Sequence, residues 1–186
     1  MVISSQYISE QATQSIASAL ETISIELGSR DVSLLPVDLE QDKEFLFNVY
    51  SSTREAELSV VGWSGDRKSE FLHMQFDAQQ VYYQTRHSQA ELLCVYENRR
   101  PIGRLYLEQR AQDFCLLDIA LLKHCRGRGI GTALVTSILK LAHRERRAVY
   151  LHVERYNPAI RLFRRLGFRQ CREVGVSYLM EWAGPT

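Results

Sequence analysis

The sequence lacks the features that are typical of membrane proteins, of secreted proteins and of domains stabilised by a structural metal ion. None of its apolar runs approaches the roughly 18 residues needed to cross a bilayer. The first residues, MVISSQYISEQ, contain neither the basic segment nor the apolar segment of a secretory signal. Only four cysteines occur, and none of their spacings is typical of a metal site. We therefore expect a cytoplasmic protein with reduced thiols, no bound metal and no membrane partner.

The chain also has almost no net charge, but its charges are unevenly distributed. The formal net charge at pH 7 is +1. Residues 1–122 contain 10 lysines and arginines against 18 aspartates and glutamates, whereas residues 123–186 contain 13 against 4. This asymmetry indicates that the last third of the chain meets an anionic ligand. The alternative is that the two parts of the chain neutralise each other.

Length and composition favour one globular domain with an added N-terminal helix. The chain has 186 residues, of which 45% are hydrophobic and 24% charged. Apolar residues three and four positions apart predict an amphipathic helix over residues 8–27, which would end at Gly28. We expect residues 1–30 to be a helical extension and residues 31–186 to be the functional domain.

The rest of the chain alternates between strand and helix patterns. Predicted strands cover residues 32–37, 91–97, 102–109, 113–122, 148–153, 169–173 and 177–182. Predicted helices cover about 39–53, 66–86, 129–145 and 157–167. Asp38 and Asn157 are suited to cap the first and last of these helices, with Pro158 in the first turn and Gly167 at the end of the last. The pattern indicates a mixed α/β domain.

The most informative stretch is HCRGRGIGTALV, residues 124–135, which places glycines and arginines directly before a predicted helix. Glycine lets an anion approach backbone N–H groups without meeting a Cβ, and a helix N-terminus favours phosphate. The stretch is not a Walker A loop, because Thr132 stands where a loop starting at Gly127 needs glycine. It is not a dinucleotide fingerprint either, because Leu134 replaces the last glycine or alanine. We expect a phosphate-binding loop of another kind.

Two stretches together resemble the GNAT superfamily of N-acetyltransferases. Arg126, Gly129 and Gly131 match the form Arg/Gln-x-x-Gly-x-Gly/Ala of the acetyl-CoA loop in that family. The stretch NPAIRLFRRLGF, residues 157–168, is similar to the later family segment Asn-x-x-Ala-x-x-Leu-Tyr-x-x-x-Gly-Phe, with the asparagine one position later. The resemblance covers about residues 31–184, and the two motifs together are specific where either alone would be weak.

The resemblance implies both a fold and a reaction. The fold would be α/β (α+β), a mostly antiparallel central sheet flanked by helices, in which strands 113–122 and 148–153 run parallel and splay apart at the acetyl-CoA site. The protein would use acetyl-CoA as co-substrate and acetylate a primary amine of a small molecule or a peptide by direct attack in a ternary complex. The extra N-terminal helix must cover its own domain or a partner subunit, which leaves a homodimer open.

The resemblance also implies which residues bind acetyl-CoA. The pantetheine arm would enter the wedge between the splayed strands and bond to main-chain groups around Ile119, Leu121 and Leu122. The pyrophosphate would bind the loop of Arg126, Gly127, Arg128, Gly129, Ile130, Gly131 and Thr132. The other wall of the wedge would be lined by Asn157, Ala159 and Phe163. The basic last third of the chain would then face the phosphates of the cofactor.

The expected reaction needs a base, because a lysine-like amine with a pKa of about 10.4 is almost fully protonated at neutral pH. In this superfamily the usual base is a carboxylate that acts through water. Asp118 and Asp113 lie on the strand before the loop and are the first candidates, ahead of Glu108 and Glu154. His152, in the middle of strand 148–153, could also accept or relay a proton. Each of these side chains could instead be an ordinary surface or packed group.

Phe163 departs from the family pattern, in which a tyrosine at this position often protonates the departing CoA thiolate. A thiol with a pKa of about 8.5 leaves more easily than an amine with a pKa of about 10.4, so water, Tyr156, Tyr178 or His152 could serve instead. The departure also keeps open an alternative function, that of a catalytically weak acyl-CoA-binding sensor or regulatory module. A nucleic-acid partner is not expected, since no helix-turn-helix or interleaved basic and aromatic pattern is present.

Overall fold

Seven strands form one sheet in the computed structural model, which describes Ile16 and residues 31–184. The strands are β1 (Val32–Pro36), β2 (Glu91–Glu97), β3 (Arg100–Gln109), β4 (Asp113–Leu121), β5 (Ala148–Glu154), β6 (Arg169–Val174) and β7 (Ser177–Trp182). Their order across the sheet is β1, β2, β3, β4, β5, β7 and β6. All neighbouring strands are antiparallel except β4 and β5, which run parallel. The expected mostly antiparallel α+β sheet is confirmed.

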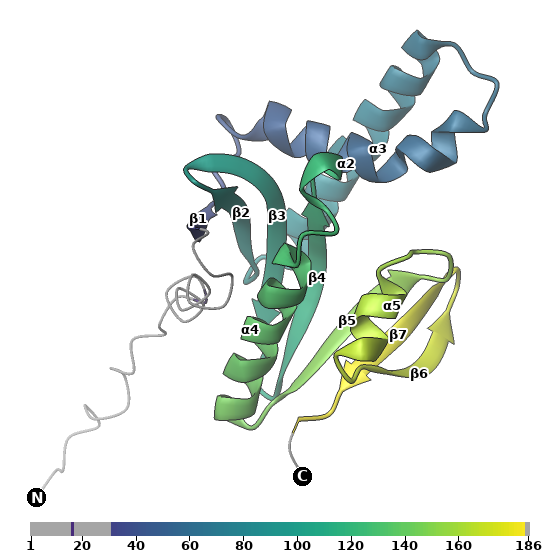
Figure 1. The fold of residues 1–186 in the computed structure, drawn as a ribbon. Coiled ribbons are helices and arrows are strands. Elements are labelled where there is room, and N and C mark those ends of the chain that lie inside the picture. The colour runs from purple at the N-terminus through teal and green to yellow at the C-terminus, as the bar shows by residue number, and fades with distance from the viewer. Residues whose placement is uncertain (1–15, 17–30, 185–186) are drawn as a thin grey trace, which may run out of the picture.

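Helices cover both faces of this sheet. They are α2 (Lys43–Ser59), α3 (Gly65–Arg86), the short 3-10 helix η2 (Lys123–Cys125), α4 (Ile130–Glu145) and α5 (Ile160–Arg165). Helices α4 and α5 lie on the side of the sheet that faces the viewer in Figure 1, and α2 and α3 pack on the other side. The helix predicted over 8–27, and with it the proposed boundary at residue 30, lies outside the described residues. Ile16 is buried, and its backbone N–H donates to Glu91 Oε1 at 2.7 Å.

Two helices begin later than the sequence predicts. Helix α2 begins at Lys43 and not near residue 39, because the Asp38 carboxylate accepts hydrogen bonds from the backbone N–H groups of Glu40 and Gln41 and closes a turn there. Helix α5 begins at Ile160. Ahead of it the Asn157 side chain accepts a hydrogen bond from the backbone N–H of Ala159 at 2.9 Å, so Asn157 shapes the turn before the helix and is not its N-cap.

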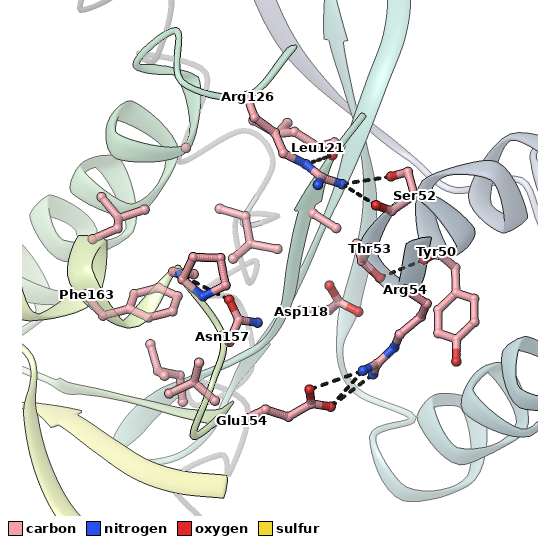
Figure 2. A pocket seen from close by; sticks show the side chains of 18 of the residues that line it. Tyr50, Ser52, Thr53, Arg54, Asp118, Leu121, Arg126, Glu154, Asn157 and Phe163 are labelled. Atoms are coloured by element: carbon pink, nitrogen blue, oxygen red, sulfur yellow. Dashed lines mark hydrogen bonds and ion pairs between the residues drawn. The ribbon is translucent and has the colours of Figure 1, made fainter. Parts of the chain in front are cut away.

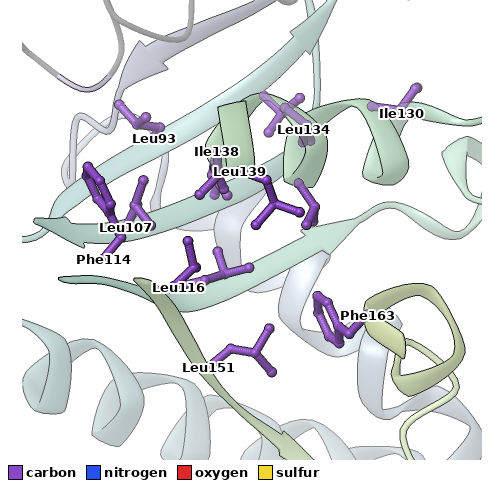
Figure 3. Close-up of a cluster of buried hydrophobic side chains, with 14 of the residues drawn as sticks. Leu93, Leu107, Phe114, Leu116, Ile130, Leu134, Ile138, Leu139, Leu151 and Phe163 are labelled. Carbon is purple, nitrogen blue, oxygen red and sulfur yellow. The ribbon is translucent and has the colours of Figure 1, made fainter. Parts of the chain in front are cut away.

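The two faces of the sheet carry different cores. The core on the α4 face is large and wholly apolar, as Figure 3 shows. It includes Leu93, Leu107, Phe114, Leu116, Leu134, Ile138, Leu151 and Phe163. The core on the α2/α3 face is smaller and centres on Leu46, Tyr50, Phe76 and Cys94. The α2/α3 face also carries a buried charge, since Arg104 on β3 is only 2% exposed.

The parallel pairing of β4 and β5 is short, and this is the feature that creates a site. It runs from Asp113 opposite Ala148 to Leu116 opposite Leu151 and then stops. A bulge interrupts β4 just beyond this point, where the register against β3 shifts between Leu116 and Asp118. Bulges bend a strand and re-aim its side chains. Beyond the bulge the two strands separate, as Figure 1 shows, so the expected splay is confirmed.

Candidate active site

A cavity of about 1570 Å³ opens where β4 and β5 separate. One wall is formed by the outer half of β4 and by α2, and the opposite wall is formed by the outer half of β5 and the segment leading into α5. Figure 2 shows Phe163 and Asn157 on one side of this space and Ser52 and Thr53 on the other. The glycines before α4 lie at one end of the cavity.

The glycine loop has the geometry of an anion-binding turn. Gly127 and Gly129 have positive φ angles of 72° and 87°, a conformation that other residues adopt at a cost. A Cβ added to either glycine would meet no protein atom within 4 Å, so the space in front of the loop is open. Helix α4 begins at Ile130, and the backbone N–H groups of its first turn have no partners within the helix. The loop can therefore hold a phosphate.

The two arginines of the loop contact protein groups. Arg126 donates from Nε to the Leu121 carbonyl at 2.8 Å and from Nη2 to Ser52 Oγ at 2.8 Å, as Figure 2 shows. Arg128 donates to the carboxylate of Glu97 at 3.0 Å, and Glu97 is only 8% exposed. These contacts tie the loop to β4, α2 and β2. Arg126 still lines the cavity, whereas Arg128 does not.

Most of the other residues expected to bind the cofactor line the cavity. They are Ile119, Leu121, Gly131, Thr132, Asn157, Ala159 and Phe163. Leu122 and Ile130 do not, because both pack into the core on the α4 face. Phe163 is 3% exposed, with its ring centroid 5.6 Å from that of Phe168. An apolar ring therefore occupies the position where the family pattern has a tyrosine.

Asp118 lies in the cavity wall beside the bulge and is held by a buried cluster. Its Oδ2 atom accepts a hydrogen bond from Arg104 Nη2 at 2.7 Å and another from the Tyr83 hydroxyl at 3.1 Å. Burial and the neighbouring Asp118 charge raise the pKa of Tyr83, so this phenol stays a proton donor. Asp118 is therefore held in place by hydrogen bonds on the α2/α3 side of the cavity, near the point where β4 and β5 diverge.

His152 lies on the opposite wall, on β5. Its neighbours Leu151 and Val153 are buried on the α4 face, so strand alternation directs His152 to the α2/α3 face, the face on which Asp118 contacts Tyr83. Partial burial lowers the pKa of His152 below its usual value of 6.5, and the positive charges of Arg172 and Arg110 lower it further. The imidazole is therefore neutral at pH 7 and can accept a proton.

Asp113 is not brought to the site. It lies at the other end of β4, opposite Ala148, and does not line the cavity. It is five positions from Asp118 along the strand, which corresponds to about 16 Å. Its carboxylate is 3.8 Å from Arg110. As a candidate base it has no access to the space where β4 and β5 diverge.

An ion pair that the sequence did not reveal crosses the cavity. Arg54 on α2 donates from Nη1 to both carboxylate oxygens of Glu154 at 3.0 and 3.1 Å, and Figure 2 shows the pair joining the two walls. Arg104 and Tyr83 were missed as well. These side chains meet only in the folded chain, and the Arg54 contact joins residues 100 positions apart, so no local spacing signals it.

Two negative findings concern only residues 31–184 and Ile16. Within them, no helix has both the length and the apolar character to cross a bilayer. Within the same residues, histidine, cysteine, aspartate and glutamate side chains form no group that could hold a metal ion.

Comparison with known proteins identifies the kind of domain. A family model described as the acetyltransferase (GNAT) family matches residues 50–168. No curated protein matches the chain significantly.

Many solved structures share the fold. The PaiA N-acetyltransferase from Thermoplasma acidophilum, solved in complex with coenzyme A, is 17% identical with a TM-score of 0.62, covering 81% of this chain and 98% of its own. An acetyltransferase from Thermus thermophilus is 19% identical with a TM-score of 0.59, covering 81% and 96%. The ribosomal-protein-S18-alanine N-acetyltransferase from Escherichia coli is 14% identical with a TM-score of 0.57, covering 84% and 96%. At these identities the likeness concerns the fold.

Proposed function

The chain belongs to the GNAT family of acetyltransferases and is thus an acyltransferase with acetyl-CoA as its co-substrate, and we propose that it acetylates a primary amine of a small molecule or a protein. The amine would attack the thioester directly in a ternary complex. The observation that carries this proposal is the cavity between two diverging parallel strands, with an open glycine loop at one end and with Asp118 and His152 on its two walls.

The cofactor would enter from the α4 face. The open loop of Gly127 and Gly129, followed by the first turn of α4, would hold the pyrophosphate. The pantetheine arm would lie along β4 at Ile119 and Leu121, where the strand has lost its parallel neighbour. The Leu121 carbonyl already accepts a hydrogen bond from Arg126, so the main-chain groups of Ile119 would be the ones that bond to the arm. Phe163 would pack against the arm from the other wall. This placement puts the thioester where the strands begin to diverge.

The acceptor would enter from the α2/α3 face, between Asp118 and His152. Only about one lysine-like amine in 2,500 is unprotonated at pH 7, and this corresponds to roughly 4.6 kcal/mol. We assign the removal of that proton to the neutral His152 imidazole, directly or through one water. The amine nitrogen then bonds to the thioester carbon, the C–S bond breaks, and the CoA thiolate leaves. The second proton that the nitrogen loses as the amide forms passes to water.

The departing thiolate would be protonated without the tyrosine of the family pattern. Tyr156 lines the cavity mouth and is 98% exposed, whereas Tyr178 does not line the cavity. Protonated His152 could return its proton to sulfur after the amine has been acylated. Water serves as well, because a thiol with a pKa of about 8.5 is a good leaving group.

The test is release of CoA thiol from acetyl-CoA in the presence of amino acids, polyamines, aminoglycosides and peptides. We expect turnover with at least one class of amine. Mass spectrometry should show a product about 42 Da heavier than that amine, because an acetyl group replaces one hydrogen. Tight CoA binding without thiol release for any amine would instead favour the alternative, a CoA-binding sensor. The buried, hydroxyl-free Phe163 is the observation that favours this second candidate.

A further inference from the structure

Arg104 is a buried charge at the inner end of the acceptor side of the cavity. Its Nη2 atom donates to Asp118 Oδ2 at 2.7 Å and to Gln79 Oε1 at 2.9 Å. The rings of Tyr50 and Tyr106 flank the guanidinium, with centroids 5.9 and 5.4 Å from Cζ. Its Nε and Nη1 atoms have no hydrogen-bond partner among the described residues. Apolar side chains of similar volume often stabilise a fold as well as such a buried pair does.

The cluster holds Asp118 by one oxygen only. Arg104 and Tyr83 both donate to Oδ2, from the β3 side and the α3 side of the carboxylate. Oδ1 accepts no hydrogen bond from the described residues and is not among the enclosed unpartnered atoms. The Asp118 side chain keeps 14% of its surface exposed and lines the cavity. The carboxylate is therefore held through Oδ2 and presents Oδ1 to the cavity.

The other acidic side chains that line the cavity are already paired. Glu55 pairs with Lys123 at 2.9 Å, and Glu57 and Glu154 both pair with Arg54. Both carboxylate oxygens of Glu154 accept hydrogen bonds from Arg54. An entering cation would have to displace that guanidinium to bind Glu154, whereas it can bind Asp118 Oδ1 without displacing any side chain of the described residues.

We propose that Arg104 and Tyr83 are positioning residues, which fix Asp118 so that its Oδ1 atom binds the acceptor as a protonated aliphatic amine. This inference rests on the proposed function and names the substrate class of that site. An alkylammonium group carries a full charge and three N–H donors, so it satisfies Oδ1 and keeps a further N–H for His152 on the opposite wall. Arylamines are uncharged at neutral pH and lack this match. The acceptors are therefore alkylamines, such as lysine side chains or polyamines.

The first experiment measures binding without chemistry, by calorimetric titration of ligands into the protein saturated with CoA at pH 7. Benzylamine is the charged probe, benzyl alcohol its neutral isostere, and aniline the arylamine. We expect benzylamine to bind roughly 10-fold to 100-fold more tightly than benzyl alcohol or aniline, in the range of hydrogen bonds to charged groups. Asp118→Asn should remove this preference and leave CoA affinity unchanged.

The second experiment tests the positioning role with a matched pair of variants. Tyr83→Phe removes one hydrogen bond to Oδ2, while Tyr82→Phe removes the hydroxyl of the adjacent tyrosine, which is 53% exposed. We expect Tyr83→Phe to weaken benzylamine binding by roughly 3-fold to 10-fold. The same variant should raise KM for a turned-over amine and leave KM for acetyl-CoA unchanged. Tyr82→Phe should match the wild type. Arg104→Lys should weaken benzylamine binding more than Tyr83→Phe does. The affinity of each variant for CoA reports whether that variant is folded.

The outcomes separate the inference from the proposed function. Equal affinity of the wild type for benzylamine and benzyl alcohol, or no binding of benzylamine, overturns the inference, and so does an Asp118→Asn protein that binds benzylamine normally. Identical behaviour of Tyr83→Phe and Tyr82→Phe overturns the positioning role, even if Arg104→Lys does not fold. Preferential binding of benzylamine with no acetyl transfer to any amine would contradict the proposed function and support the inference.

Discussion

The two sides of the wedge between β4 and β5 are built from different chemical groups. On the α4 face the cavity wall consists of glycines with positive φ, main-chain groups of β4 and buried apolar side chains. On the α2/α3 face it carries paired charges, Arg104 with Asp118 and Arg54 with Glu154. Backbone geometry suits a ligand that does not vary, such as a cofactor, whereas side-chain pairs can be exchanged to suit different acceptors. We therefore propose that the α4 side binds the cofactor and that the α2/α3 side selects the acceptor.

The largest effect is expected on the α4 side, from Gly129→Val. Valine strongly disfavours the φ of +87° at this position, and its branched side chain would fill the open space before the loop. We expect CoA affinity, measured by calorimetry, to fall more than about 100-fold, because the phosphates lose close approach to the backbone. Gly62→Val is the control, since Gly62 also has open space around it but has no positive φ. Normal CoA affinity in a folded Gly129→Val protein would refute the placement of the pyrophosphate.

An effect of comparable size is expected on the α2/α3 side, from His152→Gln. Loss of a positioned base lowers kcat by about 10²–10⁴-fold. The pKa of His152 is lowered below 6.5, so the wild type should keep its full kcat above that pH and lose activity only as the pH falls through the lowered value. The variant should show no such acid limb. If the acid limb persists unchanged in His152→Gln, another group is the base.

A stability cycle compares the two faces directly. Leu134→Ala in the apolar core should cost about 2–5 kcal/mol by leaving a cavity. Asp118→Leu should cost a similar amount, about 3–5 kcal/mol, because it leaves the Arg104 charge buried and uncompensated. The double variant Arg104→Met with Asp118→Leu should recover most of that loss. Urea denaturation measures all of them and Arg104→Met alone. Strict additivity of Arg104→Met and Asp118→Leu in the double variant would show that the pair is not coupled.

The same difference between the faces explains what could be predicted from the sequence. The strands follow from local spacing, and the family resemblance rests on the loop Arg126 to Thr132 and the α5 segment. Most of the cofactor residues that this resemblance implied line the cavity. Leu122, Arg128 and Ile130 do not, because a sequence motif cannot tell which side chains turn into the core or pair with a neighbouring strand. The Arg104 cluster could not be predicted, because its members come from α3, β3 and β4 and share no spacing.

The smallest effect is expected from Phe163→Tyr, which places the missing hydroxyl of the family pattern on the α4 side. The ring is buried and packs edge-on against Phe168, so the added oxygen can be tolerated only where the ring borders the cavity. If protonation of the thiolate by water or His152 already suffices, kcat should rise by less than about 10-fold, below the range usual for a positioned acid. CoA affinity and KM for the amine should stay unchanged. A wild type inactive toward every amine and a Phe163→Tyr protein that turns over would instead mean that this hydroxyl, and not His152, limits the reaction, and that the native chain acts as a CoA-binding module.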